Sequence, residues 1–330
     1  SVRKKSLDSI NKLSDLKILV LGEIIFDKYI FVKELDKPGK ENIKSVKYKN
    51  DSTYLGGAFP IAKILSSFVK KVDILCVGNF NSIQNNLIKK LSKDVSNLKS
   101  KIYNSPFNSI TKTRYIDEKN VKLFEEYNLN GEKKFENYNL RKIFGDINNY
   151  DLVILADFGH GLFDKNIINF ISKHSKFLSV NAQTNSGNRG FNLITKYKKA
   201  NYICLDKLEI NLAMSNRDDN IDYQIKELYK KIKTGNITVS LGAQGIIVSK
   251  KIRNKINYSK LPAFEVKPVD TLGAGDAVFA ISSALIKKNT NIEITALISN
   301  LVGALQTNIL GHSKSITKID VIKALTHALK

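Results

Sequence analysis

The arrangement of apolar segments is the feature that most restricts the fold. Short apolar runs of strand length, such as residues 17–22 and 151–156, alternate with stretches whose apolar residues recur at helical spacing, such as 164–174. This alternation is typical of βαβ units, in which helices cover both faces of a mainly parallel sheet. We therefore predict an α/β fold with a sheet of about nine strands flanked by helices.

Further segments continue the same pattern. Strands are expected at residues 72–77, 177–181, 201–205 and 237–240. Helices are expected at residues 57–68, 83–91, 207–214, 274–286, 292–310 and 318–329. With 330 residues, the chain is expected to form a single domain over 1–330 rather than two unrelated domains.

Two separated regions break the alternation. Short polar-alternating runs of β character occur in residues 29–54 and again in residues 110–128, without helices between the runs of each region. Such runs predict a small second sheet that stands off the main one. A small sheet beside an open α/β core is typical of a lid over the crevice at the strand ends.

Charge and cysteine content narrow the classes of function. The net charge is +22, but six of the 53 basic residues are arginine and the lysines are scattered, whereas nucleic-acid sites favour clustered arginine. Nucleic-acid binding is therefore a disfavoured alternative. Cys76 and Cys204 lie in apolar runs and are expected to be buried thiols, and no apolar run is long enough to span a bilayer. We expect a cytoplasmic protein without a membrane partner.

Residues 270–276, Asp-Thr-Leu-Gly-Ala-Gly-Asp, carry the strongest signal of function. Glycines just before a helix allow backbone N–H groups to converge on an anion, and the helix dipole adds positive potential. Gly273, Ala274 and Gly275 are thus expected to form an anion hole. A carboxylate beside that anion is suited to removing a proton from an attacking hydroxyl, so Asp276 is the expected base. The alternative is that Asp276 only complements the helix dipole.

The complete seven-residue string resembles the signature of the ribokinase-like, or PfkB, carbohydrate kinases, and the resemblance extends over nearly the whole chain. The chain is most similar to the heptose-phosphate kinase domain of ADP-heptose synthases. Residues 157–161, Asp-Phe-Gly-His-Gly, resemble the Asp-Tyr-Gly-Lys-Gly segment of those kinases, with His160 in place of lysine, and residues 111–114 resemble their lid. The resemblance implies a ribokinase-like fold and phosphoryl transfer from ATP, with Mg²⁺, to a hydroxyl of a sugar or sugar phosphate.

The resemblance also implies substrate-binding residues near the N-terminus. Asp27 matches a family aspartate that contacts sugar hydroxyls, and Gly56 and Gly57 match glycines whose backbone approaches the sugar. Pro60 stands where the family usually has asparagine, which removes one expected contact. In the polar loop at 181–190, Arg189 is one of the few arginines and is expected to hold a substrate phosphate.

The nucleotide and the metal are assigned on the same basis. The resemblance places Thr271, Gly242, Gly245 and Asn300 beside the nucleotide, and a plain hairpin is the alternative for the two glycines. Asp206 and Glu209 occupy the positions of a family Asn-x-x-Glu pair that organises Mg²⁺, largely through water. A helix N-cap with an acid in the first turn is the alternative for this pair.

The sequence is also compatible with two other functions of this fold. One is a nucleoside kinase, and the other is a catalytically weak sensor of sugar nucleotides, suggested by Pro60, His160 and Asp206. The intact string at 270–276 favours catalysis over sensing. The resemblance further implies a homodimer through the lid, and fusion to or pairing with a nucleotidyltransferase.

Overall fold

The computed structural model describes residues 1–35, 43–128, 138–216, 220–264, 267–309 and 313–329. Within these residues, nine strands form one sheet in the order β13-β12-β11-β10-β9-β8-β1-β4-β5, which is parallel from β11 to β5. The predicted mainly parallel α/β fold is therefore confirmed. The strands are β1 (Lys17–Gly22), β4 (Lys71–Asn79), β5 (Leu98–Asn108), β8 (Leu152–Asp157), β9 (Leu178–Ala182), β10 (Tyr202–Asp206), β11 (Asn236–Ser240), β12 (Ile246–Ile252) and β13 (Lys255–Leu261).

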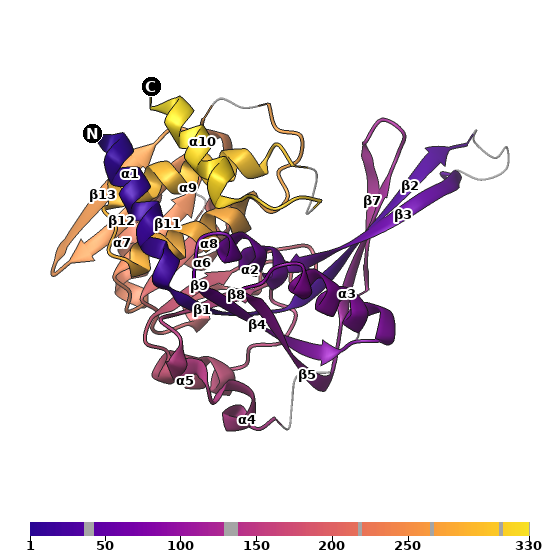
Figure 1. Cartoon of the computed structure of the whole chain (residues 1–330), viewed down its shortest axis with the longest axis horizontal. Coiled ribbons are helices and arrows are strands. Elements are labelled where there is room, and N and C mark those ends of the chain that lie inside the picture. Colours follow the sequence, from indigo (N-terminus) through magenta and orange to yellow (C-terminus); the bar gives the residue numbers. More distant parts are fainter. Residues whose placement is uncertain (36–42, 129–137, 217–219, 265–266, 310–312, 330) are drawn as a thin grey trace.

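Helices cover both faces of this sheet (Figure 1). They are α1 (Val2–Asn11), α2 (Ala58–Ser66), α3 (Ser82–Lys93), α4 (Leu140–Phe144), α5 (Lys165–His174), α6 (Lys207–Met214), α7 (Ile221–Lys231), α8 (Ala274–Lys287), α9 (Ile292–Gln306) and α10 (Lys318–Ala328). Ile18 packs in the core that includes α2, α8 and α9, whereas the next residue, Leu19, packs in the core that includes α5, α6 and α7. Because successive strand residues point to opposite faces and both faces are covered, these strands are continuous apolar runs.

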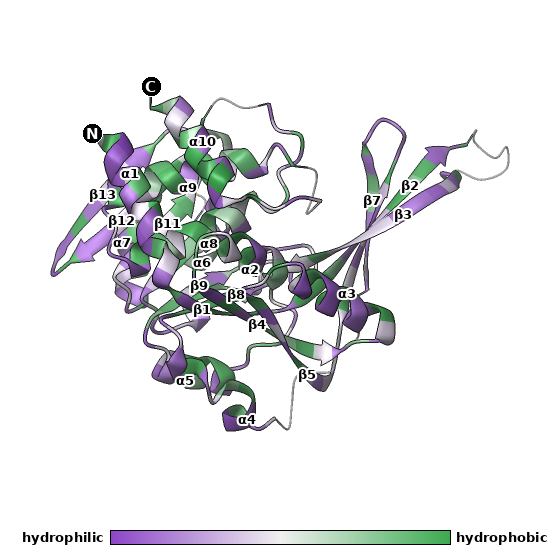
Figure 2. Cartoon of the chain, viewed as in Figure 1, coloured by the Kyte–Doolittle hydropathy of each residue, from purple (hydrophilic) through white to green (hydrophobic). Residues whose placement is uncertain are grey.

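The predicted small sheet is also present and extends away from the main body (Figure 1). It contains β2 (Ile24–Glu34), β3 (Val46–Gly57), β6 (Ile110–Ile116) and β7 (Lys122–Asn128), in the order β3-β2-β6-β7. Figure 2 shows hydrophobic residues concentrated in the central strands and buried helices, whereas β3 is mostly hydrophilic. The strands begin before residue 29 and continue past residue 54, and residues 36–42 of the predicted range lie outside the described residues.

Several boundaries differ from those predicted. The second helix begins at Ala58 rather than at Gly57, because Gly57 adopts φ of 64° and acts as its N-cap. The helix predicted to reach residue 310 ends at Gln306, and the hydroxyl of its C-cap residue, Thr307, donates to the carbonyl of Ala304 (2.7 Å). Strands β5 and β13 and helices α1, α4 and α7 were not predicted, and β12 was expected without bounds, as the strand after the turn at 242–245. Lysine and asparagine interrupt the apolar residues of β5 and β13.

The carboxyl ends of the parallel strands share one edge of the main sheet. The turns after β1, β8, β9, β10 and β11 all leave the sheet at this edge, and the small sheet begins directly after β1. In open α/β sheets, ligands bind in the crevice outside these strand ends. Among the helices of the described residues, none is long and apolar enough to cross a membrane.

Candidate active site

The loop at 270–276 is fixed to the end of α9. The carboxylate of Asp270 accepts from the backbone N–H of Leu272 (3.1 Å), and its own N–H donates to the carbonyl of Thr307 (3.1 Å). Gly273 caps α8 with φ of 78°, a left-handed conformation that glycine adopts without strain. The loop therefore holds the N-terminus of α8, with its unpaired first-turn N–H groups, in a defined place.

A cavity of about 700 Å³ lies against this helix N-terminus at the ends of β10 and β11. Its lining includes all four residues predicted to contact the nucleotide, as well as two members of the predicted anion hole and one predicted metal residue. These lining residues are Thr271, Gly242, Gly245, Asn300, Ala274, Gly275 and Asp206. Segments far apart in the sequence thus meet around one space large enough for a nucleotide.

Glycine occupies the positions that line this cavity for different structural reasons. A Cβ atom on Gly275 or on Gly242 would meet nothing within 4 Å, so both leave open space. Gly245 has φ of 102°, and a Cβ atom there would lie 2.0 Å from the carbonyl oxygen of Leu261. Gly245 is therefore required by the packing of the β11–β12 turn on β13, as the hairpin alternative predicted.

Asp276 lies where the N-terminus of α8 meets the small sheet. Burial raises the pKa of its carboxyl group to about 7, the ammonium of Lys112 on β6 opposes this shift, and the charge of Asp27 on β2 adds to it. The residue as a whole is half-buried. A carboxyl group that titrates near neutral pH is well matched to accepting a proton.

Asp27 is held in a buried ion pair. Its Oδ1 is 2.5 Å from a guanidinium nitrogen of Arg114 on β6, and the side chains of both residues are 5% exposed. The Nε of Arg114 also donates to Glu125 (2.8 Å). A Cβ atom on Gly56 would lie 1.9 Å from Oδ2 of Asp27, so only glycine leaves room for this carboxylate.

Lys112 lies on the same face of β6 as Arg114, because alternate strand residues share a face. Its residue surface is 6% exposed, and its Nζ lies 5.2 Å from the centre of the Tyr127 ring. Burial lowers its pKa, and its charged neighbours include Asp27 and Asp276. No carboxylate forms an ion pair with Lys112 in the part of the chain that the structure describes.

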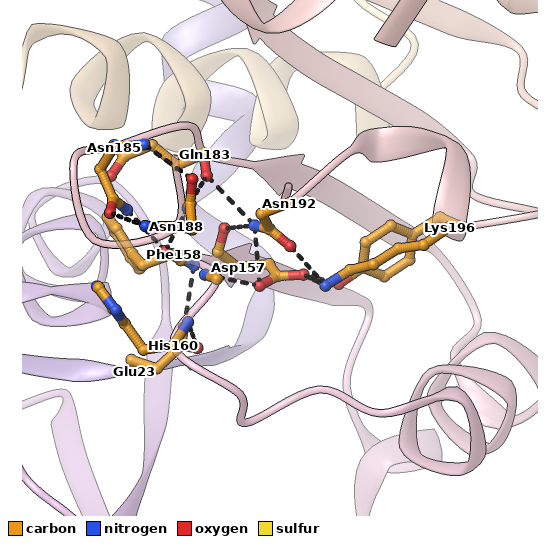
Figure 3. Close-up of polar contacts among 11 residues, drawn as sticks. Glu23, Asp157, Phe158, His160, Gln183, Asn185, Asn188, Asn192 and Lys196 are labelled. Carbon is orange, nitrogen blue, oxygen red and sulfur yellow. Dashed lines mark hydrogen bonds and ion pairs between the residues drawn. The ribbon is translucent and has the colours of Figure 1, made fainter. Parts of the chain in front are cut away.

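Figure 3 shows a polar network at the carboxyl ends of β8 and β9. Asp157 accepts from the hydroxyl of Tyr197 (2.6 Å) and pairs with Lys196, while Asn192 donates to its backbone carbonyl (2.9 Å). Burial, with the charge of Asp157, raises the pKa of Glu23 to about 7. This network fixes the loops after β1, β8 and β9 relative to one another.

Arg189 lies in the loop after β9. The loop is held by the amides of Asn185 and Asn188, which both donate to the carbonyl of Phe158 (2.7 and 3.0 Å). Arg189 is exposed, has φ of 48°, and donates its backbone N–H to the carbonyl of Asn185 (3.0 Å). It is not among the residues that line the cavity beside α8.

Comparison with known proteins identifies the family. The sequence model described as pfkB family carbohydrate kinase matches residues 15–318. The chain belongs to the pfkB family. Curated relatives named bifunctional protein HldE occur in Campylobacter fetus subsp. fetus (strain 82-40), at 22% identity over 304 residues, and in Aliarcobacter butzleri (strain RM4018), at 25% over 311 residues. These matches cover 90% and 89% of this chain, but only 64% and 61% of the relatives.

Solved structures of other kinases share the ribokinase-like fold. Ribokinase from Thermotoga maritima has a TM-score of 0.72 at 17% identity, covering 94% of this chain and 99% of its own. Phosphofructokinase-2 from Escherichia coli in complex with fructose-6-phosphate has a TM-score of 0.71 at 13% identity, covering 96% of this chain and 100% of its own. Together with the pfkB match, these likenesses support a carbohydrate kinase.

The pfkB family generally uses ATP and Mg²⁺, and the predicted metal residues form a capping box at the start of α6. Oδ1 of Asp206 accepts from the N–H of Glu209 (2.7 Å), and Oε2 of Glu209 accepts from the N–H of Asp206 (2.8 Å). Glu209 also accepts from Asn181 and Thr184 (3.2 Å each), and burial beside Asp206 raises its pKa to about 8. The structure thus shows the capping alternative directly.

These residues also fit a metal held mainly by nucleotide phosphates. No group of three or more His, Cys, Asp or Glu side chains among the described residues is placed to hold a metal ion. Mg²⁺ in phosphate-binding sites typically keeps several waters and uses only one or two carboxylates. Asp206 lines the cavity and supplies hard oxygen atoms, so a water-bridged ion beside it is compatible with this geometry.

Three charged residues of the small sheet were not predicted individually. Lys112 is a charged neighbour of both Asp27 and Asp276, Arg114 pairs with Asp27, and Glu125 pairs with Arg114. Residues 111–114 resemble the lid of related kinases, and the two-residue spacing of Lys112 and Arg114 is the signal that both face one side of the strand. Which side they face follows from the pairing of β6 with β2, which only the structure gives.

Proposed function

We propose that this chain is an ATP-dependent kinase that phosphorylates a hydroxyl group of a sugar phosphate, with Asp276 as the general base. The observation that carries the proposal is the position of Asp276. It stands between the N-terminus of α8, which borders a nucleotide-sized cavity, and the buried Asp27 and Lys112 of the small sheet. Donor and acceptor can therefore meet at this carboxyl group.

In the proposed reaction, Asp276 takes the proton of the acceptor hydroxyl as its oxygen forms a bond to the γ-phosphorus of ATP. The bond from that phosphorus to the β–γ bridging oxygen breaks, and ADP leaves. Backbone N–H groups of residues 273–275 stabilise the charge that develops on the transferred group. Asp27, fixed by Arg114, orients the acceptor hydroxyls. Mg²⁺, when bound beside Asp206 and Glu209, would neutralise phosphate charge.

Three observations support a phosphorylated acceptor over a neutral one. Lys112 is a buried cation without an ion-pair partner among the described residues, and Arg189 is exposed on the loop after β9. The sequence also resembles kinases whose sugar already carries a phosphate. A heptose phosphate is the acceptor that this resemblance favours, and a nucleotidyltransferase on the same or another chain is the partner that it suggests.

The direct test is ADP release from Mg-ATP against a panel of sugars and sugar phosphates, heptose phosphates included. We expect a sugar phosphate to give the highest kcat/KM. No acceptor-dependent ADP release with any member would contradict the kinase proposal, and better use of neutral sugars would contradict the phosphorylated acceptor. Binding of a polyanion that weakens steeply with salt would instead support the nucleic-acid alternative.

Replacing Arg189 by Lys tests its proposed contact with the acceptor phosphate. The variant keeps the charge but loses the bidentate guanidinium fork, so we expect acceptor KM to rise about 10-fold while KM for ATP stays unchanged. Arg253→Lys is the matched control, because Arg253 is also exposed and has a similar φ of 54°. Equal acceptor KM values in both variants would assign Arg189 to the surface.

Replacing Glu209 by Gln tests the proposed magnesium role. A nearby cation favours the ionised carboxylate, so wild-type affinity for Mg²⁺ should increase as pH rises through about 8, where Glu209 titrates. Gln keeps the length of the side chain but not its charge, and we expect about 10-fold weaker Mg²⁺ dependence without this pH effect. Asp206→Asn, which keeps the N-cap, is expected to change little. Identical magnesium titrations for wild type and Glu209→Gln would leave only the capping role.

A further inference from the structure

His160 lies on the turn after β8 and has no role in the reaction proposed above. Its backbone N–H donates to Oε1 of Glu23 (3.1 Å), which fixes the main chain at this point. The Nε2 atom of its ring is buried and has no hydrogen-bond partner among the described residues. Figure 3 shows the same division, since the dashed line from His160 begins at the backbone nitrogen and none reaches the ring.

A buried polar atom without a partner is unusual in a native structure and needs a reason. A merely structural histidine would be expected to bond through its ring, as His174 does with the carbonyl of Phe170 (2.8 Å). The main-chain bond to Glu23 already holds the turn in place, so it does not require the imidazole. A group that binds here only with the substrate would satisfy Nε2.

The surroundings of His160 belong to the acceptor side of the site. The ammonium of Lys112 is a charged neighbour of His160, and it is also a charged neighbour of Asp27 and Asp276. His160 follows β8, and Asp27 lies on β2 just after β1, so both are at the carboxyl edge of the main sheet, where ligands bind in sheets of this type.

The charge state of the ring determines which ligand group suits it. Burial, together with the ammonium of Lys112, lowers the pKa of His160 to about 4, so the ring is neutral at neutral pH. A neutral imidazole offers one donor and one acceptor nitrogen. A neutral imidazole is therefore better suited to a hydroxyl group, which can both donate and accept a hydrogen bond. A phosphate would instead be attracted to the neighbouring ammonium.

We propose that His160 is a specificity-determining residue that binds a hydroxyl group of the acceptor through Nε2, beside Lys112. This inference rests on the proposed kinase function and identifies a contact within that site. It also gives a physical reason for histidine where the resembling kinases have lysine. A second ammonium next to Lys112 would add repulsion between like charges, whereas the imidazole adds a hydrogen bond without charge.

The test uses the acceptor with the highest kcat/KM in the sugar and sugar-phosphate panel, together with its monodeoxy analogues. Wild type is expected to lose about 10- to 100-fold in acceptor KM with one analogue, the one that lacks the contacted hydroxyl. His160→Leu should show the same loss with the complete acceptor and no further loss with that analogue. Its kcat and its KM for ATP should change less than about 3-fold.

Two further variants and one control distinguish a direct contact between His160 and the acceptor from an effect on folding. His160→Gln restores a neutral polar group and should recover part of the acceptor affinity, while His160→Lys should not. His174→Gln on the exposed end of α5 is the control and should leave the acceptor KM unchanged. Melting temperatures of all variants should lie within a few degrees of wild type, which confirms folding.

The outcomes distinguish this inference from the function on which it rests. If wild type releases no ADP with any acceptor, the proposed function fails and the contact fails with it. If wild type is active but His160→Leu keeps a normal acceptor KM, the His160 contact alone is overturned. The same holds if wild type and His160→Leu lose equal acceptor affinity with every monodeoxy analogue.

Discussion

Replacing Asp276 by Asn is expected to lower kcat about 10²- to 10⁴-fold, the usual range for loss of a general base. Asparagine has nearly the same shape as aspartate but cannot accept the hydroxyl proton. Because the first turn of α8 and the cavity beside it stay intact, KM for ATP should change little. The measurement is steady-state ADP release with saturating Mg-ATP and the best acceptor. A kcat within 3-fold of wild type would reject Asp276 as the base.

The pH dependence of wild type supplies an independent check on Asp276. The base must be ionised to act, and its pKa is raised to about 7, so kcat/KM should rise about 10-fold per pH unit below 7 and level off above it. This limb should be absent from the residual activity of Asp276→Asn.

The same raised pKa predicts a gain in stability for Asp276→Asn. The folded state disfavours the ionised carboxyl group, so the aspartate destabilises it increasingly as pH rises from its usual pKa of 3.8 toward about 7. The stability advantage of the asparagine variant should grow over this window and stay constant above it. An equal difference in unfolding free energy between Asp276→Asn and wild type at pH 5 and at pH 8 would contradict the raised pKa.

Replacing Arg114 by Met is expected to destabilise the small sheet by about 3–5 kcal/mol, the usual cost of leaving one partner of a buried ion pair without the other. Both side chains of the Arg114–Asp27 pair are almost fully buried, so water cannot replace the guanidinium. Hydrogen exchange of the backbone amides in β2 and β6 measures this loss directly. Acceptor KM should rise as well, because Asp27 is no longer held in place.

Two variants control for loss of packing at Arg114. Arg114→Lys keeps the charge and should destabilise the small sheet less than Arg114→Met. The double variant Arg114→Met/Asp27→Leu removes both charges and should recover much of the stability, although not the activity. If the amide exchange of β2 and β6 changes by less than about 1 kcal/mol in Arg114→Met, the ion pair does not stabilise this sheet.

Much of the fold could be predicted because its signals are local. The strand-length runs at residues 17–22 and 201–205 and the helix at 207–214 follow from hydrophobic periodicity, which depends on neighbouring residues alone. Strand β13 was missed because lysine and asparagine interrupt its apolar residues, and its pairing with β12 decides its conformation.

In the candidate site, too, some features follow from neighbouring residues and others depend on contacts between distant segments. The sequence by itself determined the family, through the motif at 270–276. It also predicted the anion-hole glycines and the base, because these residues are contiguous and their chemistry follows from a helix N-terminus. Only the tertiary structure brought Lys112 and Arg114 beside Asp27 and Asp276, since pairing of β6 with β2 and burial of the charges depend on contacts distant in sequence. The unpartnered ring of His160 has the same origin: whether a polar atom finds a hydrogen-bond partner is decided by the groups that folding places around it.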